Sequence, residues 1–78
     1  MTIREVVKVL NNNPKIGLQL TKHKGILKST WAIYIRGNHY YYFDVSEKFI
    51  FDKQHRYKEN ELFNEFKNGI YTIDEEIL

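Results

Sequence analysis

The chain has 78 residues, a formal net charge of +2, no cysteine and 42% hydrophobic residues. The hydrophobic content excludes intrinsic disorder, and the lack of cysteine excludes disulfides and thiolate zinc sites, so apolar packing must stabilise one small domain over residues 1–78. The longest uncharged apolar stretches are shorter than the ~18 residues that cross a bilayer, so we expect a cytoplasmic protein with no membrane partner.

The charges are segregated along the chain. Residues 1–40 contain seven Lys/Arg and one acidic residue, whereas residues 41–78 contain five Lys/Arg and nine acidic residues. A basic half can contact phosphates or an acidic protein, while an acidic half keeps the molecule soluble. The charge pattern therefore favours nucleic acid or a protein as the partner.

The N-terminal residues predict an amphipathic helix followed by a strand. Thr2 and Glu5 form a capping-box pattern, and apolar residues follow at helical spacing. The Asn-Asn-Asn-Pro run at residues 11–14 ends this helix, because the residue before a proline is pushed out of helical geometry. Residues 16–20 alternate between apolar and polar, which indicates a strand with one buried face, and the basic residues 22–28 are predicted to form a loop.

Gly37 and Asn38 predict the central hairpin. They separate two aromatic runs, residues 31–36 and residues 39–44, and a glycine suits the positive φ at the first position of a two-residue type II′ turn. A turn of this length pairs Tyr34 with Tyr41, and it pairs Arg36 with His39. A further turn near Ser46 and Glu47 would return the chain as a fourth strand over residues 48–52.

The C-terminal part predicts a second helix. After a polar connector at residues 52–57, residues 58–67 carry apolar side chains at helical spacing, and Gly69 is placed to adopt the left-handed C-terminal cap. Residues 70–73 fit a short edge strand, and the acidic residues 74–76 fit a solvated tail. We therefore predict an α+β fold with two helices and a mainly antiparallel sheet of about four strands.

The central hairpin is apolar on both faces, whereas a half-buried antiparallel sheet usually has one polar face. Either the helices cover both faces, or one face is a binding platform or is shared between two copies in a homodimer. Exposed tyrosines can stack on unpaired bases while lysines neutralise phosphates. The candidate nucleic-acid-binding residues are Lys15, Lys22, Lys24, Lys28, Tyr34, Arg36, His39 and Tyr41.

One part of this pattern resembles a known family. A sheet led by Trp31, followed by a helix with Leu62 and Phe63, is similar over residues 28–67 to the arm-type DNA-binding domains of phage integrases. That family lacks the leading helix and strand predicted here, so none of its site residues is carried over. The short chain, rich in Asn, Lys, Ile and Tyr, also resembles accessory proteins of phages and mobile elements.

Catalysis is not expected of this chain. The three histidines have no spacing typical of a metal site, and no glycine-bearing elbow or phosphate loop surrounds a serine or threonine. We therefore expect a non-enzymatic binding module without metal or cofactor. Its partner is nucleic acid in the first hypothesis; in the alternative, its acidic half makes it a protein interaction module or inhibitor.

Overall fold

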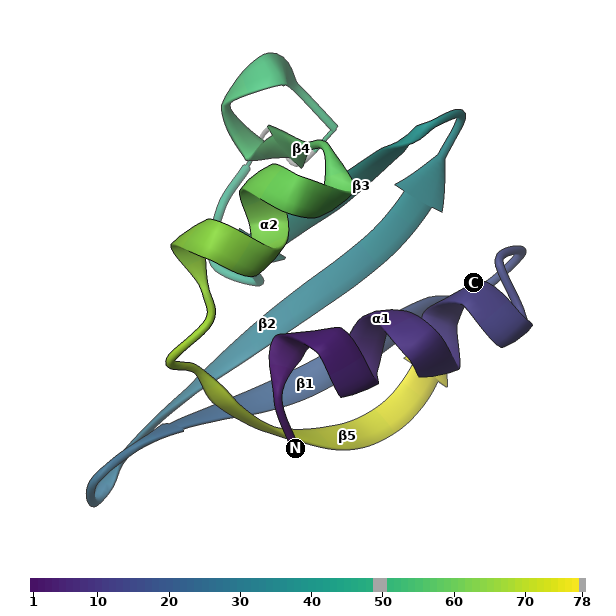
Figure 1. Ribbon diagram of the computed structural model, residues 1–78. Coiled ribbons are helices and arrows are strands. Elements are labelled where there is room, and N and C mark those ends of the chain that lie inside the picture. Colours follow the sequence, from purple (N-terminus) through teal and green to yellow (C-terminus); the bar gives the residue numbers. More distant parts are fainter. Residues whose placement is uncertain (49–50, 78) are drawn as a thin grey trace.

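The part of the chain that the structure describes forms a five-stranded antiparallel sheet with both helices on one of its faces (Figure 1). The computed structural model describes residues 1–48 and 51–77. The elements in chain order are α1 (Ile3–Asn12), β1 (Gly17–Lys24), β2 (Leu27–Arg36), β3 (His39–Asp44), the 3-10 helix η1 (Lys53–His55), β4 (Arg56–Tyr57), α2 (Glu59–Glu65) and β5 (Ile70–Ile77). The strand order is β4-β3-β2-β1-β5, so the last strand lies beside the first. The predicted α+β class is confirmed.

The N-terminal helix begins as predicted. The Thr2 hydroxyl accepts a hydrogen bond from the Glu5 backbone N–H, and the Glu5 carboxylate accepts one from the Thr2 N–H at 2.9 Å. The Thr2 N–H and the Thr2 hydroxyl, which donates to the same carboxylate at 3.2 Å, stabilise its charged form and lower the pKa of Glu5. The apolar stripe is buried against the sheet, and its members are Ile3, Val6, Val7 and Leu10.

The central hairpin is also confirmed. Gly37 has a φ of 63°, and Asn38 has no positive φ, which is the pattern of a type II′ turn. Tyr34 lies opposite Tyr41, as the turn length predicts. The two-residue turn therefore determines which side chains share a face along β2 and β3.

The predicted basic loop at residues 22–28 is wrong. β1 continues to Lys24 and β2 begins at Leu27, so only Gly25 and Ile26 form the connection. Gly25 has a φ of 62°, which allows the same tight turn as Gly37. The segment is therefore a second hairpin with ordered strand pairing.

The predicted strand over residues 48–52 is not found in its described part. Phe49 and Ile50 lie outside the described residues, and Lys48, Phe51 and Asp52 lie in no strand. The fourth strand in chain order is instead the two-residue β4, which pairs with β3. The predicted connector over residues 52–57 thus contains η1 and β4. The Asp52 carboxylate caps η1, because it accepts hydrogen bonds from two backbone N–H groups.

The C-terminal helix is shorter than predicted, and its predicted glycine cap is wrong. α2 ends at Glu65, and Gly69 has no positive φ. A Cβ at Gly69 would lie 2.5 Å from the Tyr71 hydroxyl oxygen, so this glycine permits close packing rather than a left-handed turn. β5 is eight residues long and includes the acidic residues 74–76, whose side chains are exposed as predicted.

The core lies between the two helices and one face of the sheet. It contains the α1 stripe, Leu62 of α2, and side chains from four strands, namely Leu18, Leu20, Ile33, Tyr40, Tyr42 and Tyr71. The radius of gyration is 11.4 Å, close to the roughly 11.5 Å expected for a compact chain of this length. No helix in the described ranges is long and apolar enough to span a membrane.

A buried tyrosine pair joins β3 to β5 beneath the helices. The Tyr42 and Tyr71 hydroxyl oxygens lie 2.7 Å apart and share a hydrogen bond, and each residue is 1% exposed. Burial disfavours the phenolate and raises the pKa of both groups. Each hydroxyl therefore depends on the other for its hydrogen bond.

We predict that Tyr71→Phe lowers the free energy of unfolding by about 1–3 kcal/mol, because it leaves the buried Tyr42 hydroxyl without its partner. The second change, Tyr42→Phe in the same molecule, should cost little more or restore part of the loss. Urea unfolding of the wild type, both single variants and the double variant measures this coupling. Additive single costs would contradict the prediction.

We further predict that stability falls above about pH 10. The unfolded chain then loses its tyrosine protons at their ordinary pKa, whereas folded Tyr42 and Tyr71 retain theirs, so the unfolded state is favoured as pH rises. In this range each of the two tyrosines lowers the free energy of unfolding by about 1.4 kcal/mol for each unit of pH. Urea unfolding from pH 8 to pH 11 should show a smaller slope for the double phenylalanine variant, and an equal slope would refute the assignment.

Candidate functional site

One hairpin projects beyond the rest of the sheet, at the lower left in Figure 1. The first residue of β5, Ile70, pairs with His23, and the last residue of β3, Asp44, pairs with Trp31, so neither strand extends further toward the hairpin tip. Residues 24–29 therefore have no partner in β3 or β5, and the strand residues among them pair only across the β1–β2 hairpin. We call residues 22–29 the basic hairpin.

The basic hairpin is positively charged and apolar at its tip. Its charged side chains are Lys22, Lys24 and Lys28, and the sequence has no acidic residue between Glu5 and Asp44. At the tip, Ile26 is 97% exposed and Leu27 is 67% exposed. The projection thus combines cations with unburied apolar surface.

The lysines lie on both faces of the basic hairpin. Side chains alternate along a strand, so Lys22 and Lys24 share the helix-side face with Leu20. Lys28 lies opposite His23 in the β1–β2 register and belongs to the other face. A ligand that follows the edge of the hairpin can therefore meet cations from both sides.

A groove of about 370 Å³ lies at the base of the basic hairpin and has Trp31 in its wall. One face of the Trp31 ring stacks on Tyr42, with ring centroids 4.6 Å apart and planes 15° from parallel. The indole N–H donates a hydrogen bond to the Ser29 hydroxyl at 2.7 Å, which fixes the ring. The remaining lining residues are Lys22, Lys24, Leu27, Lys28 and Ser29.

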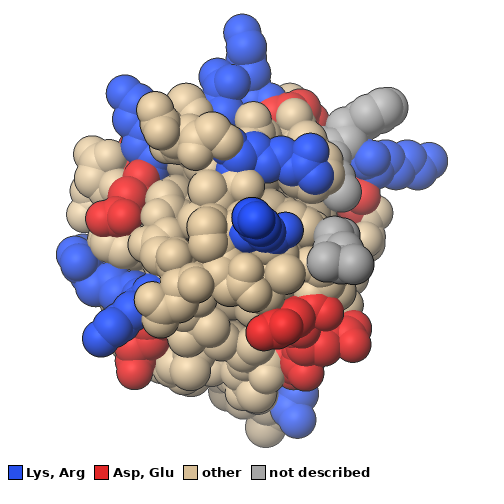
Figure 2. Space-filling model, turned by 90° about the vertical axis from the view of Figure 1, so that its right-hand side faces the viewer, with Lys and Arg blue, Asp and Glu red and all other residues tan. Residues whose placement is uncertain are grey.

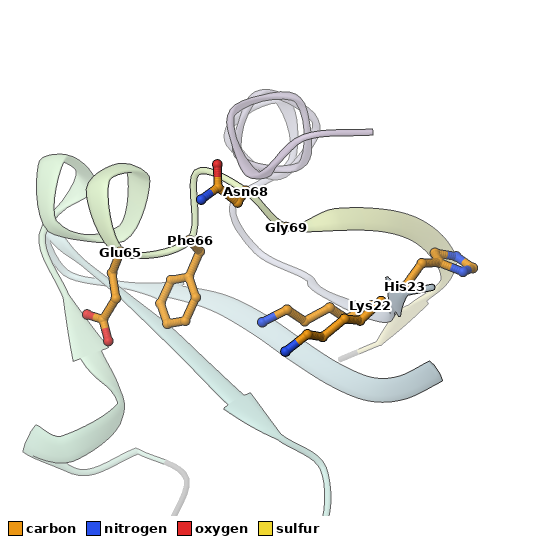
Figure 3. A pocket seen from close by; sticks show the side chains of 7 residues that line it. Lys22, His23, Glu65, Phe66, Asn68 and Gly69 are labelled. Atoms are coloured by element: carbon orange, nitrogen blue, oxygen red, sulfur yellow. The ribbon is translucent and has the colours of Figure 1, made fainter. Parts of the chain in front are cut away.

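Lys22 lies between two aromatic rings. Its Nζ is 5.1 Å from the Trp31 ring centroid and 5.4 Å from the Phe66 ring centroid, and in the described residues no carboxylate forms an ion pair with it. Figure 3 shows the lysine extending toward Phe66 while His23 points away on the other side of β1. This lysine, Glu65 and Asn68 are among the residues that line an adjoining hollow of about 230 Å³. The cation is therefore held by ring faces and is available to an anion.

The other candidate cations lie at the opposite end of the sheet. Arg36 and His39 flank the Gly37 turn, and Lys15 lies in the connection between α1 and β1. Arg36 is eight residues from Lys28 along β2, which corresponds to about 26 Å. Figure 2 views the molecule from this end and shows acidic and basic side chains interspersed. The candidate site residues are thus divided between two ends of the molecule.

A third aromatic ring packs on the predicted tyrosine platform. Phe51 lies over the face opposite the helices, with its ring centroid 5.2 Å from that of Tyr34 and 5.4 Å from that of Tyr41. The Arg36 guanidinium lies 3.8 Å from the centroid of the Phe51 ring. Tyr34 and Tyr41 therefore form an aromatic cluster with Phe51, whose own side chain is 38% exposed. In the described residues both helices pack on the other face, so no helix covers these tyrosines.

The histidine and acidic residues make local structural contacts. The His55 ring nitrogen lies 2.7 Å from the Asp52 carboxylate that caps η1. On β1 and β5, the His23 ring is hydrogen-bonded to Thr72 at 2.8 Å. Within residues 1–48 and 51–77, no group of three such side chains is arranged to hold a metal ion.

Sequence reasoning missed the groove at Trp31. The prediction assigned Trp31 to an apolar sheet face but treated residues 22–28 as a loop, which left Lys22 and Lys24 without a position relative to the indole. A usable signal was present, because Gly25 and Ile26 repeat the glycine-first turn of Gly37 and Asn38. A two-residue turn there pairs Leu20 with Trp31 and places Lys22 on the same face.

A comparison of the chain with protein-family models, curated proteins and solved structures finds no match. The strands next to β2 are β1 and β3, and no strand occupies the described part of residues 48–52. The likeness of residues 28–67 to integrase arm-type domains therefore remains one of sequence pattern.

We predict that the backbone amides of residues 24–29 exchange hydrogen at least about tenfold faster than those in the middle of β1, because neither β3 nor β5 flanks these residues. Exchange followed residue by residue by NMR in dilute solution measures this difference. Equal protection would mean that another surface covers the hairpin, and repeating the measurement at several protein concentrations would identify a second copy as that cover.

Proposed function

We propose that this protein is a non-enzymatic binding module that contacts nucleic acid through the basic hairpin. The observation that carries the proposal is the position of three lysines on a projecting two-stranded ribbon whose own strands contain no acidic residue. Such a projection can approach a phosphate backbone without bringing the acidic residues of β5 close to it. Glu75 and Glu76 pair with Gln19 and Leu18, and Asp74 accepts a hydrogen bond from the Thr21 hydroxyl, so all three lie along the part of β1 that precedes the basic hairpin.

The binding would be electrostatic and salt-dependent. Lys22, Lys24 and Lys28 can each neutralise one phosphate and release its counterion. For a single strand, three contacts predict a slope of about −2 when the logarithm of affinity is plotted against the logarithm of salt concentration. This slope is small, so we expect weak binding that is strongest at low ionic strength.

The remaining candidate residues have smaller roles in this proposal. Three of them lie at the other end of the sheet, namely Lys15, Arg36 and His39. They can contact the bound nucleic acid only if it extends across the whole molecule. Tyr34 and Tyr41 are packed against Phe51 and stabilise the fold. The apolar tip formed by Ile26 and Leu27 also favours contact with a protein, and this is the alternative that the experiment below must separate.

We predict that labelled oligonucleotides bind the protein with micromolar affinity at low salt, and that the Lys22→Glu/Lys24→Glu variant binds at least about tenfold more weakly, because two phosphate contacts become repulsive. Fluorescence anisotropy titrations at two salt concentrations measure both effects.

The matched control is Lys48→Glu/Lys53→Glu, which makes the same charge change at two exposed positions outside the basic hairpin. This variant should retain most of the affinity. An equal loss in both variants would show that net charge alone governs binding. Absence of binding at low salt would refute the nucleic-acid proposal and leave the apolar tip as a protein contact.

A further inference from the structure

We infer that the groove at Trp31 binds one unpaired base, so that the ligand of the basic hairpin is single-stranded nucleic acid rather than a duplex. This inference rests on the proposed function and adds to it a base-binding subsite. The groove volume of about 370 Å³ lies at the lower end of the range of small-ligand pockets, which is roughly 300–1,000 Å³. A single nucleotide is a ligand of that scale.

The chemistry of the groove matches a planar apolar group attached to an anion. Trp31 and Leu27 supply apolar surface, Lys22 and Lys24 lie on the same face of the hairpin, and the lining, which also includes Lys28, contains no carboxylate. The base of a nucleotide has a π-face that can stack on the indole, and its phosphate has the negative charge that complements the lysines. Charge complementarity therefore favours a nucleotide over a neutral ligand or a basic peptide.

Trp31 is held in place for stacking. Tyr42 occupies one face of its ring and the Ser29 hydroxyl holds its N–H, so the indole does not need to reorganise when a ligand arrives. The other face is covered by the Lys22 ammonium, 5.1 Å from the centroid. A cation–π contact at a partly exposed site is weaker than base stacking, so a base can take this face while Lys22 moves to the phosphate.

This geometry favours a single-stranded ligand over a duplex. Bases inside a duplex are stacked on their neighbours and have no free face, whereas unpaired bases can turn out onto an aromatic side chain. The groove opens beside the sheet at the base of the basic hairpin, and a duplex could reach the lysines but could not place a base against Trp31. The subsite therefore distinguishes the two forms.

The experiment uses Trp31 as its own reporter, because the chain contains one tryptophan. The full chain is titrated with a 12-nucleotide single strand and with the same strand annealed to its complement, each carrying a fluorescent label. Anisotropy of the label reports binding, and tryptophan emission reports stacking. We expect the single strand to bind at least about fivefold more tightly than the duplex and to quench Trp31 at the same protein-to-ligand ratio.

The two readouts separate failure of the subsite from failure of the proposed function. Single-strand binding without a change in tryptophan emission, or duplex binding of equal strength, would overturn the base subsite and leave phosphate binding by the basic hairpin intact. No anisotropy change with either ligand would overturn both.

A pair of variants adds a test that does not depend on fluorescence. Leu27→Ser removes an exposed apolar wall of the groove, and we expect it to weaken single-strand binding about threefold to tenfold. Val9→Ser makes a comparable change on the exposed side of α1 and should leave affinity unchanged. Equal affinities for Leu27→Ser and wild type would count against base contact in this groove.

Discussion

The offset between β2 and its neighbours is the constraint on which the rest of the molecule depends. β2 has ten residues, and β3 has only six, which pair with the end of β2 nearest the Gly37 turn. The overlapping part of the strands supplies the floor of the core, where Ile33 and Tyr42 lie beneath the helices. The part of β2 that extends past β3 forms, with the end of β1, the projecting tip of the basic hairpin. One difference in strand length therefore produces both the packed centre and the projecting surface.

The elements predicted correctly from the sequence are those with local chemical signals. Thr2 and Glu5 determine the start of α1, and Gly37 determines both the central turn and the register that follows from it. These features depend on backbone hydrogen bonds and dihedral preferences among residues near in sequence. They could be predicted because no distant contact is needed to produce them.

The features that were not predicted depend on distant contacts. Phe51 belongs to an apolar run typical of a strand, but its ring packs on Tyr34 and Tyr41 instead, since both helices lie on the other face of the sheet. Gly69 was predicted to cap α2, but the structure places it against the Tyr71 ring. The groove at Trp31 differs from these two, because it follows from the β1–β2 register and the local signal for that register at Gly25 was overlooked. For Phe51 and Gly69, tertiary packing overrode the local preference.

The neighbouring position of β1 and β5 has a consequence for how the chain folds during synthesis. β1 is complete by residue 24, yet its second partner is made of residues 70–77. A ribosome that adds about 5–20 residues per second takes several seconds to make the intervening chain. Throughout that interval the outer edge of β1 has unpaired backbone groups, which makes this edge the place where a nascent chain is most open to pairing with another molecule. Chaperone contact with the nascent protein should concentrate there and end when β5 emerges.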